Sequence, residues 1–356
     1  MASTPPLLLK TKAKVTATAT LTTTKGNSLL PSPQLHVIFG LTAHSYGASE
    51  TGSFISVLSS VRNGVRENGR LYPSYGKYEY GLPMDESELD RNQLQHHKFT
   101  LLLNHRLYLA PIPDSVLEQP GSRVLDMGTG NGVWAIDMAD KFPHAEIIGN
   151  DIAAVQPSFV PPNCIFEIED VEEDWPYPRQ YFDFIHGREF LYAIRDWPRL
   201  ISQAHNALRP GGWIQLASSY PLLRSDDDTL PPNSALLEIT DSFIEISEKA
   251  GASVHALREW KHQLTDAGFI NVADVVLKIP MNGWPKDDLL RQVGELEEWM
   301  LRDGMESLML RGWTQVLHRP AEDLALYIAL AKKELRDTSV HSYIFFHITY
   351  GQRPWS

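Results

Sequence analysis

Three alternate glycines follow an acidic residue in the run from Val124 to Gly132, which reads Val-Leu-Asp-Met-Gly-Thr-Gly-Asn-Gly. Glycines permit positive φ angles and carry no Cβ atom, so a ligand can approach the backbone closely. The apolar residues before Asp126 are typical of a buried strand, and those after Gly132 have the composition of a helix. A strand, a tight loop and a helix in this order predict a site for a nucleoside cofactor.

Two kinds of cofactor bind to loops of this type. The dinucleotide fingerprint has glycines at its first, third and sixth positions, whereas the sixth position here is Val133. Asp126 stands at the strand end, where its charge suits a cationic ligand better than a pyrophosphate. The loop therefore favours S-adenosylmethionine (SAM), which carries an ammonium group and no phosphate, over NAD. Taken alone, the loop also fits a glycine-rich turn that binds nothing.

The elements around this loop alternate between strand and helix patterns. Seven strands are expected: 123–125, 146–151, 165–168, 181–186, 213–216, 270–279 and 343–350. Such alternation predicts an α/β fold with a doubly wound, mostly parallel, Rossmann-like sheet. A helical cap should precede the sheet, and a helical insertion should precede its last strand.

In such sheets, ligands bind at the carboxyl ends of the strands. Asp126 ends the first predicted strand, and Asp151 ends the second, 21 residues after Gly130. That separation is close to the ~20 residues expected for an acid that binds ribose hydroxyls. Asp170 follows the third strand, where its carboxylate can accept from an adenine amino group. His186 and the residues after it follow the fourth.

A tyrosine-rich segment from Gly69 to Asp90 precedes the sheet. Its tyrosines cannot form one stripe of a helix, because Pro73, Gly76, Gly81 and Pro83 interrupt the segment. Aromatic side chains on an irregular loop suit a lid over a ligand, and Tyr75, Tyr78 and Tyr80 are the expected contacts. Anchoring of the segment to the core is the alternative.

Composition limits the classes of partner. The formal net charge is −12, which argues against binding of a nucleic-acid backbone. No apolar run approaches the ~18 residues of a membrane span. The single cysteine, Cys164, excludes internal disulfides and cysteine-cluster metal sites. The adjacent His96 and His97 point apart on a helix, so no metal is expected.

The chain is expected to divide into three parts. Residues 1–40 are rich in Ser, Thr, Ala and Pro and should form a disordered tail. Residues 41–118 should form the tyrosine-rich and helical cap. Residues 119–356 should form the cofactor-binding domain, with the helical insertion at 281–338. Cytoplasmic localisation is expected, with the nucleus as the alternative.

Taken together, these motifs closely resemble the fungal LaeA-like SAM-dependent methyltransferases, from about Gly69 to Pro354. The resemblance is carried by Gly69 to Tyr72, Leu82 to Glu86, Val124 to Asp137, Gln156-Pro157, Val160 to Asn163, Asp170 to Glu172, Phe184 to Arg188, Asp196-Trp197, Pro210 to Trp213, Trp284 to Lys286 and His341 to Tyr343. It implies a class I methyltransferase fold. It also implies SAM contacts at Asp126, Gly128, Gly130, Asp151, Asp170 and Val171, and the neighbouring Gly132, Ile152 and His186 complete the predicted cofactor site.

The chain departs from the family at two places. Asn131 stands where members commonly have Thr, which should preserve the loop. After the fifth predicted strand, members usually have an acid, whereas this chain has Ser218 and Ser219. That position tends to face the substrate, so these serines and Arg188 are the expected substrate contacts. Loss of the acid puts in doubt how this chain holds or deprotonates its substrate.

Methyl transfer from SAM is a direct displacement, so alignment of the reactants supplies much of the rate acceleration. A hydroxyl acceptor gains further from a general base. His186 and His341 are the candidate bases, the first for its strand-end position and the second for its family motif. A structural role is the alternative for each.

Three functions remain open from the sequence. The first is O- or N-methylation of a small secondary metabolite. The second, which the resemblance implies, is a nuclear regulator of secondary metabolism that binds a protein partner. The third is a SAM-binding scaffold that catalyses a rearrangement without methyl transfer. A homodimer or a regulatory protein partner is a further expectation.

Overall fold

The computed structural model describes residues 63–190 and 193–356. The predicted tail and the first part of the predicted cap lie outside the described residues. Within the described part, no helix combines the length and apolar character that a membrane span requires.

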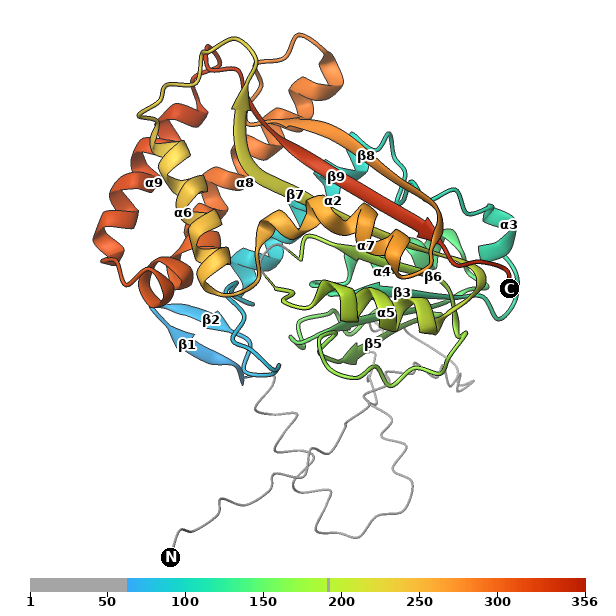
Figure 1. Cartoon of the computed structure of the whole chain (residues 1–356). Coiled ribbons are helices and arrows are strands. Elements are labelled where there is room, and N and C mark those ends of the chain that lie inside the picture. Colours follow the sequence, from blue (N-terminus) through green and yellow to red (C-terminus); the bar gives the residue numbers. More distant parts are fainter. Residues whose placement is uncertain (1–62, 191–192) are drawn as a thin grey trace, which may run out of the picture.

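A seven-stranded sheet forms the centre of the fold, with strand order β5-β4-β3-β6-β7-β9-β8 (Figure 1). The strands from β3 to β7 run parallel, and β9 pairs antiparallel with both β7 and β8. This architecture confirms the predicted doubly wound, mostly parallel sheet. The bounds are β3 Arg123–Met127, β4 Glu146–Asp151, β5 Cys164–Ile168, β6 Phe182–Arg188, β7 Leu208–Ser225, β8 Ile270–Pro280 and β9 Ser342–Gln352.

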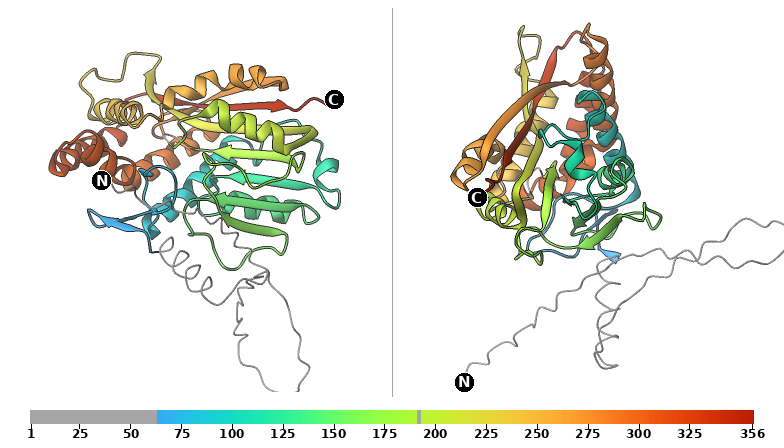
Figure 2. Two further views of the ribbon diagram at one scale, coloured as in Figure 1. Left: turned by 60° about the horizontal axis from the view of Figure 1, so that its bottom comes forward. Right: turned by 90° about the vertical axis from the view of Figure 1, so that its right-hand side faces the viewer.

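Helices cover both faces of the sheet (Figure 2). Successive residues of a strand point to opposite faces, so Val124 and Leu125 of β3 enter different cores. Val124 packs with Trp134 of helix α4 (Val133–Lys141). Leu125 packs in the other core with Leu200 and Trp260, which belong to α5 (Trp197–Ala207) and α7 (Trp260–Asp266). The short η1 (Val254–Glu259) precedes α7, and α3 (Asp114–Leu117) precedes β3.

Helix α2 (Glu86–Leu102) lies before the sheet in the chain, after the small hairpin of β1 (Val65–Glu67) and β2 (Arg70–Tyr72). Asp85 caps its N-terminus, accepting from the backbone N–H of Glu88. The helix buries several polar residues, namely Glu88, Arg91, Gln95, His96 and Lys98. Buried polar groups of this kind need specific partners, which its neighbours supply.

The predicted helical insertion lies between β8 and β9. It consists of α8 (Asp288–Arg311), the π-helical turn η2 (Gly312–Val316) and α9 (Ala321–Leu335). Together with α6 (Ala235–Lys249) these helices form a third core, in which Met305, Met309 and Trp313 are buried. Helix α2 packs against α8, so the N-terminal cap and the insertion are joined.

Strand β7 is longer than the sequence predicts. The expected strand ends at Leu216, whereas β7 continues to Ser225. The reason is its pairing with β9, which continues from Trp213↔Gln352 to Ser225↔Ser342 with one irregularity. Ser218 and Ser219 therefore lie within a paired strand rather than at a strand end, and this part of the sequence-based prediction is wrong.

Candidate functional site

The loop after β3 has the conformation that its glycines predict. Gly128, Gly130 and Gly132 have φ angles of +59°, +58° and +82°. Asp151 fixes the loop from β4, because its Oδ2 accepts from Gly130 N at 2.8 Å and its Oδ1 from Ala153 N at 2.9 Å. We refer to Asp126, the loop from Gly128 to Gly132 and Asp151 as the cradle.

The three glycines of the cradle differ in their surroundings. A Cβ atom at Gly128 would lie 2.8 Å from Phe190, and one at Gly132 would lie 2.4 Å from Phe166. These two positions need glycine for packing as well as for conformation. At Gly130 the nearest atom would be Asn92 Nδ2, at 3.9 Å, so a side chain there would enter open space.

Asp126 and His186 form a buried pair at the ends of β3 and β6. His186 Nδ1 lies 2.7 Å from Asp126 Oδ1, and Thr129 donates to the other carboxylate oxygen at 2.6 Å. The imidazole ring stacks on Trp134 at a centroid distance of 3.8 Å. Burial lowers the pKa of His186, although Asp126 acts in the opposite direction. The ring is therefore a weak proton acceptor, and its Nδ1–H donates to the carboxylate.

Burial also affects Asp151. It raises the pKa of this carboxyl to about 6, and the nearby charge of Asp126 acts in the same direction, whereas the backbone N–H donors oppose them. A carboxylate in this range changes its protonation state close to neutral pH.

The tyrosine-rich segment lines the cavity near the end of β5. Asp170 Oδ2 accepts from Lys77 N at 2.7 Å, which ties the segment to the sheet. The guanidinium of Arg195 lies 3.9 Å from the ring centroid of Tyr78. Tyr78 and Tyr80 line the cavity, whereas Tyr75 does not.

Helix α2 supplies a charged wall. Arg91 donates to both carboxylate oxygens of Glu88, at 2.9 and 2.7 Å. Arg188, from the end of β6, contacts His96 Nδ1 at 3.0 Å. Behind this wall, Lys98 pairs with Glu297 of α8 at 2.5 Å, and the two side chains are only 1% and 3% exposed. The ion pair fixes α2 to the insertion.

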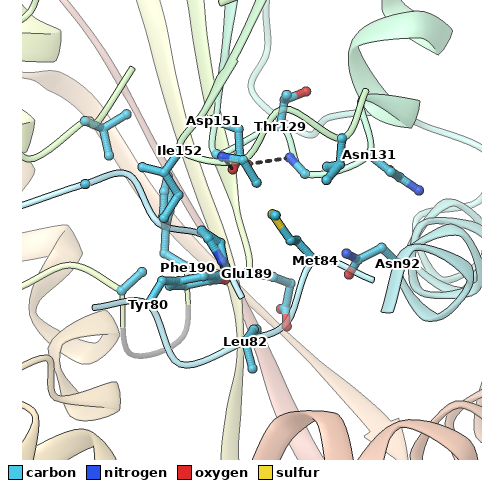
Figure 3. Close-up of a pocket in the computed structure, with 18 of the residues that line it drawn as sticks. Tyr80, Leu82, Met84, Asn92, Thr129, Asn131, Asp151, Ile152, Glu189 and Phe190 are labelled. Atoms are coloured by element: carbon cyan, nitrogen blue, oxygen red, sulfur yellow. Dashed lines mark hydrogen bonds between the residues drawn. The ribbon is translucent and has the colours of Figure 1, made fainter. Parts of the chain in front are cut away.

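These elements surround a cavity of about 170 Å³. Figure 3 shows Asp151 and Thr129 on one side of it and Glu189 and Leu82 on the other. Its lining includes eight acidic residues and three arginines: Glu79, Glu88, Asp126, Asp151, Glu169, Asp170, Glu172 and Glu189, with Arg91, Arg188 and Arg195. An acidic lining favours a cationic ligand.

The structure brings most of the predicted site residues to this cavity: Asp126, Gly128, Gly130, Asp151, Ile152, Asp170, Val171, His186, Arg188, Tyr78 and Tyr80. Gly132, Tyr75, Ser218, Ser219 and His341 are outside its lining. Gly132 still shapes the loop, because its backbone N–H donates to Thr129 O at 3.0 Å.

His341 lies at the far end of β7 and β9, away from the cradle. Its Nδ1 contacts Asp227 Oδ2 at 2.5 Å, and its backbone N–H donates to Thr229 Oγ1 at 2.8 Å. These contacts fix the loop after β7. The structure therefore favours the structural alternative for His341 over the role of a base.

Ser218 and Ser219 are buried in β7 and line a separate small pocket with Trp197, Val254 and Trp260. Ser219 holds Glu189: its backbone N–H donates to Glu189 Oε1 at 2.6 Å, and its hydroxyl also interacts with this carboxylate. The side chains that the sequence analysis assigned to the substrate thus do not reach the cavity, because the strand continues past them.

Glu189, Phe190 and the polar face of α2 also line the cavity and were not predicted from the sequence. Glu88, Arg91 or Asn92, and Gln95 recur at helical spacing, and this periodicity could have indicated a polar face that points inward. Glu189 follows directly after the Phe184 to Arg188 motif, so its position at a strand end could also have been predicted from the sequence.

Comparisons with known proteins agree with this geometry. A family model described as a methyltransferase domain matches residues 94–274. Methyltransferase pytC of Aspergillus terreus is 37% identical over 304 residues, which cover 85% of this chain and 92% of that protein. Secondary metabolism regulator LAE1 of Cochliobolus heterostrophus is 34% identical, over 81% of this chain and 94% of that protein. The chain belongs to the LaeA-like family of fungal methyltransferases. A further member, protein-methionine methyltransferase laeA of Emericella nidulans, is 31% identical over 83% of this chain and 78% of that protein.

Among solved structures, phosphoethanolamine N-methyltransferase 2 of Haemonchus contortus, solved with S-adenosyl-L-methionine, aligns with a TM-score of 0.42 and 16% identity. The alignment covers 72% of this chain and 52% of that chain.

The protein is thus a SAM-dependent methyltransferase of fungal secondary metabolism. Its residues fit the cofactor: Gly130 opens onto the cavity, and the lining is acidic, as a sulfonium and an ammonium group require. Asp126, Gly128, Gly130, Asp151, Ile152, Asp170, Val171 and His186 are the residues that would hold it. When bound, SAM supplies an electrophilic methyl group on a positively charged sulfur.

Proposed function

We propose that this methyltransferase methylates a hydroxyl or amine of a small secondary metabolite. The observation that carries the proposal is the cavity, which has the cradle on one side and the charged wall of α2 on the other. Such a space suits a small molecule placed between the cradle and the wall. The similarity to a protein named methyltransferase pytC supports this reading.

The chain's own residues contribute mainly by alignment and by exclusion of water. The contact of Lys77 with Asp170 holds the tyrosine-rich segment against the cavity. A lining held in this way can orient the acceptor, and alignment can contribute roughly 7–11 kcal/mol to a displacement of this kind. His341 is not part of this proposal, and His186 enters it as a partner of Asp126.

The test is transfer of a labelled methyl group. Purified protein is incubated with methyl-labelled SAM and fractionated fungal metabolite extracts, and the products are analysed by chromatography and mass spectrometry. We expect a labelled small molecule that is heavier by one CH₂ unit. Absence of any labelled product, from protein that binds S-adenosylhomocysteine in calorimetry, would contradict the proposal.

A regulatory role is the second candidate, because several relatives are named secondary metabolism regulators. In that case the label would appear on protein, or a tagged copy would enter the nucleus with a co-purifying partner. The first candidate expects a cytoplasmic tag. A product of unchanged mass would instead indicate the rearrangement scaffold. A homodimer stays a prediction, which light scattering tests.

A further inference from the structure

Glu189 is an acidic residue on the side of the cavity opposite Asp151 (Figure 3). It follows directly after β6, three residues after His186 in the chain. The acid that members of the family usually have at the position of Ser218 and Ser219 is missing from this chain, and the carboxylate of Glu189 lies beside β7 at Ser219.

The backbone of Glu189 is fixed in a costly conformation. Its φ angle is +57°, in the left-handed region that residues other than glycine rarely adopt. Its N–H donates to Ala217 O at 2.9 Å, and the next residue, Phe190, packs against Gly128. Strained residues of this kind cluster at functional sites, where the surrounding structure compensates for their cost.

The carboxylate of Glu189 is held by uncharged donors. Ser219 N donates to Oε1 at 2.6 Å, and Gln95 Nε2 donates to Oε2 at 3.2 Å. The hydroxyl of Ser219 also interacts with this carboxylate. An ionised carboxylate accepts about four hydrogen bonds, so these three donors leave it the capacity for a further donor. The carboxylate is therefore oriented but not saturated.

Other acidic residues of the cavity are engaged differently. Glu88 forms a bidentate pair with Arg91, and Glu172 pairs with Arg195. Asp126, Asp151 and Asp170 belong to the cradle or its neighbourhood. Glu189 differs from them in two ways. It lies opposite the cradle, and its hydrogen-bond donors, Ser219 and Gln95, are uncharged.

The charged groups near Glu189 come from several elements. Burial raises the pKa of its carboxyl, while Lys98 on α2 and the adjacent Arg188 act in the opposite direction. Lys98 is itself neutralised by Glu297 of α8, and Arg91 by Glu88. A carboxylate with a raised pKa is a better proton acceptor than an exposed one.

We propose that Glu189 accepts the proton that the methyl acceptor loses, and that the acceptor reacts through an uncharged hydroxyl or amine rather than a carboxylate. This inference rests on the proposed function. The acceptor's oxygen or nitrogen forms the new bond to carbon with its lone pair, and the carbon–sulfur bond breaks with its electrons left on sulfur. The proton of the acceptor passes to the Glu189 carboxylate and then to solvent.

The charge of the cavity supports the same class of acceptor. Eight acidic residues and three arginines line it, so a carboxylate acceptor would meet predominantly negative charge. The guanidinium of Arg188 already contacts His96 and the ring of Phe99, so it does not form a separate anion site. An uncharged hydroxyl or amine avoids this repulsion.

The test compares Glu189→Gln with Glu306→Gln, an exposed position on α8. Using the acceptor found with labelled SAM, we expect Glu189→Gln to lower kcat by ~10²- to 10⁴-fold. The acidic limb of the pH profile of kcat should also disappear. Affinity for S-adenosylhomocysteine should stay within about threefold, which would show that the cradle is intact, and Glu306→Gln should behave like wild type.

The inference would be overturned if Glu189→Gln kept a third of kcat or an unchanged acidic limb. An acceptor-free measurement separates it from the proposed function: infrared difference spectra over pH should show a carboxyl band that titrates in wild type and is missing from Glu189→Gln. Without that band the inference fails, whatever the acceptor. Absence of methyl transfer by wild type counts against the proposed function instead.

Discussion

His186 Nδ1 lies 2.7 Å from Asp126 Oδ1, and this contact joins the ends of two adjacent parallel strands. Because burial keeps the ring neutral, the histidine acts as a donor that orients the carboxylate of the cradle. The pair therefore explains a strand-end histidine without assigning it the role of a base.

Two substitutions at His186 separate its role as a hydrogen-bond donor to Asp126 from its role as a ring stacked on Trp134. His186→Asn keeps a donor near the Nδ1 position, whereas His186→Phe keeps an aromatic ring against Trp134 and removes the donor. A hydrogen bond to a charged group contributes about 1.5–3 kcal/mol. We expect calorimetry to show roughly tenfold weaker binding of S-adenosylhomocysteine by the Phe variant than by the Asn variant. Equal affinities of the two variants would argue against an orienting donor.

His341→Ala should leave kcat within about twofold of wild type, because its contacts with Asp227 and Thr229 lie outside the cavity lining. Steady-state kinetics with the labelled-SAM acceptor checks this expectation. A loss of kcat beyond tenfold, with unchanged melting temperature, would restore His341 as a candidate base.

Asp151 should make stability depend on pH. The folded pKa of about 6 lies above the unfolded value near 3.9, so the folded state binds more protons between these values. The contribution of Asp151 to the free energy of unfolding therefore decreases as pH rises from about 4 to 6.

Asp151→Asn removes this titration. In urea denaturation without cofactor, the free energy of unfolding of the variant should rise relative to that of wild type by roughly 2 kcal/mol between about pH 4 and pH 6. Parallel pH profiles for the two proteins would show that Asp151 does not titrate in this window.

Gly130→Ala and Gly128→Ala should have different effects. A methyl group at Gly130 enters open space in the cavity, so we expect a large loss of S-adenosylhomocysteine affinity. The free energy of unfolding should fall by only about 1 kcal/mol, because of the left-handed φ angle. At Gly128 the methyl group would collide with Phe190, so stability should fall further. Replacing Phe190 by Leu in the Gly128→Ala background should recover part of that stability, as followed by thermal unfolding.

The buried pair of Lys98 and Glu297 offers a double-mutant test. Removing one partner leaves an unpaired buried charge, so Lys98→Met or Glu297→Met alone should destabilise the protein by about 3–5 kcal/mol. The double variant should be much closer to wild type, because well-packed apolar side chains can replace a buried ion pair. Additive losses in urea denaturation would contradict this account.

The cradle was predictable from sequence, and the opposite side of the cavity was not. Alternating glycines and strand-end acids such as Asp126 and Asp151 have fixed positions in a doubly wound sheet, so local patterns suffice for them. Ser219 could not be placed from such a pattern, because the length of β7 depends on pairing with β9, more than a hundred residues later in the chain. Lys98 and Glu297 come together only because α2 packs against α8, and local sequence patterns cannot predict that contact.

The two sides of the cavity come from different parts of the chain, because α2, which packs against α8, faces the sheet from outside it. The cradle comes from β3 and β4, whereas Asn92 and Gln95 come from α2 and Leu82 and Met84 from the segment before it. Under the proposed function, substitutions at Leu82, Met84, Asn92 or Gln95 would change which acceptor fits while Asp126 and Asp151 stay the same. Evolution could then vary the acceptor by changes in this one segment, with Lys77 and Leu89 kept for their contacts with Asp170 and Asn131.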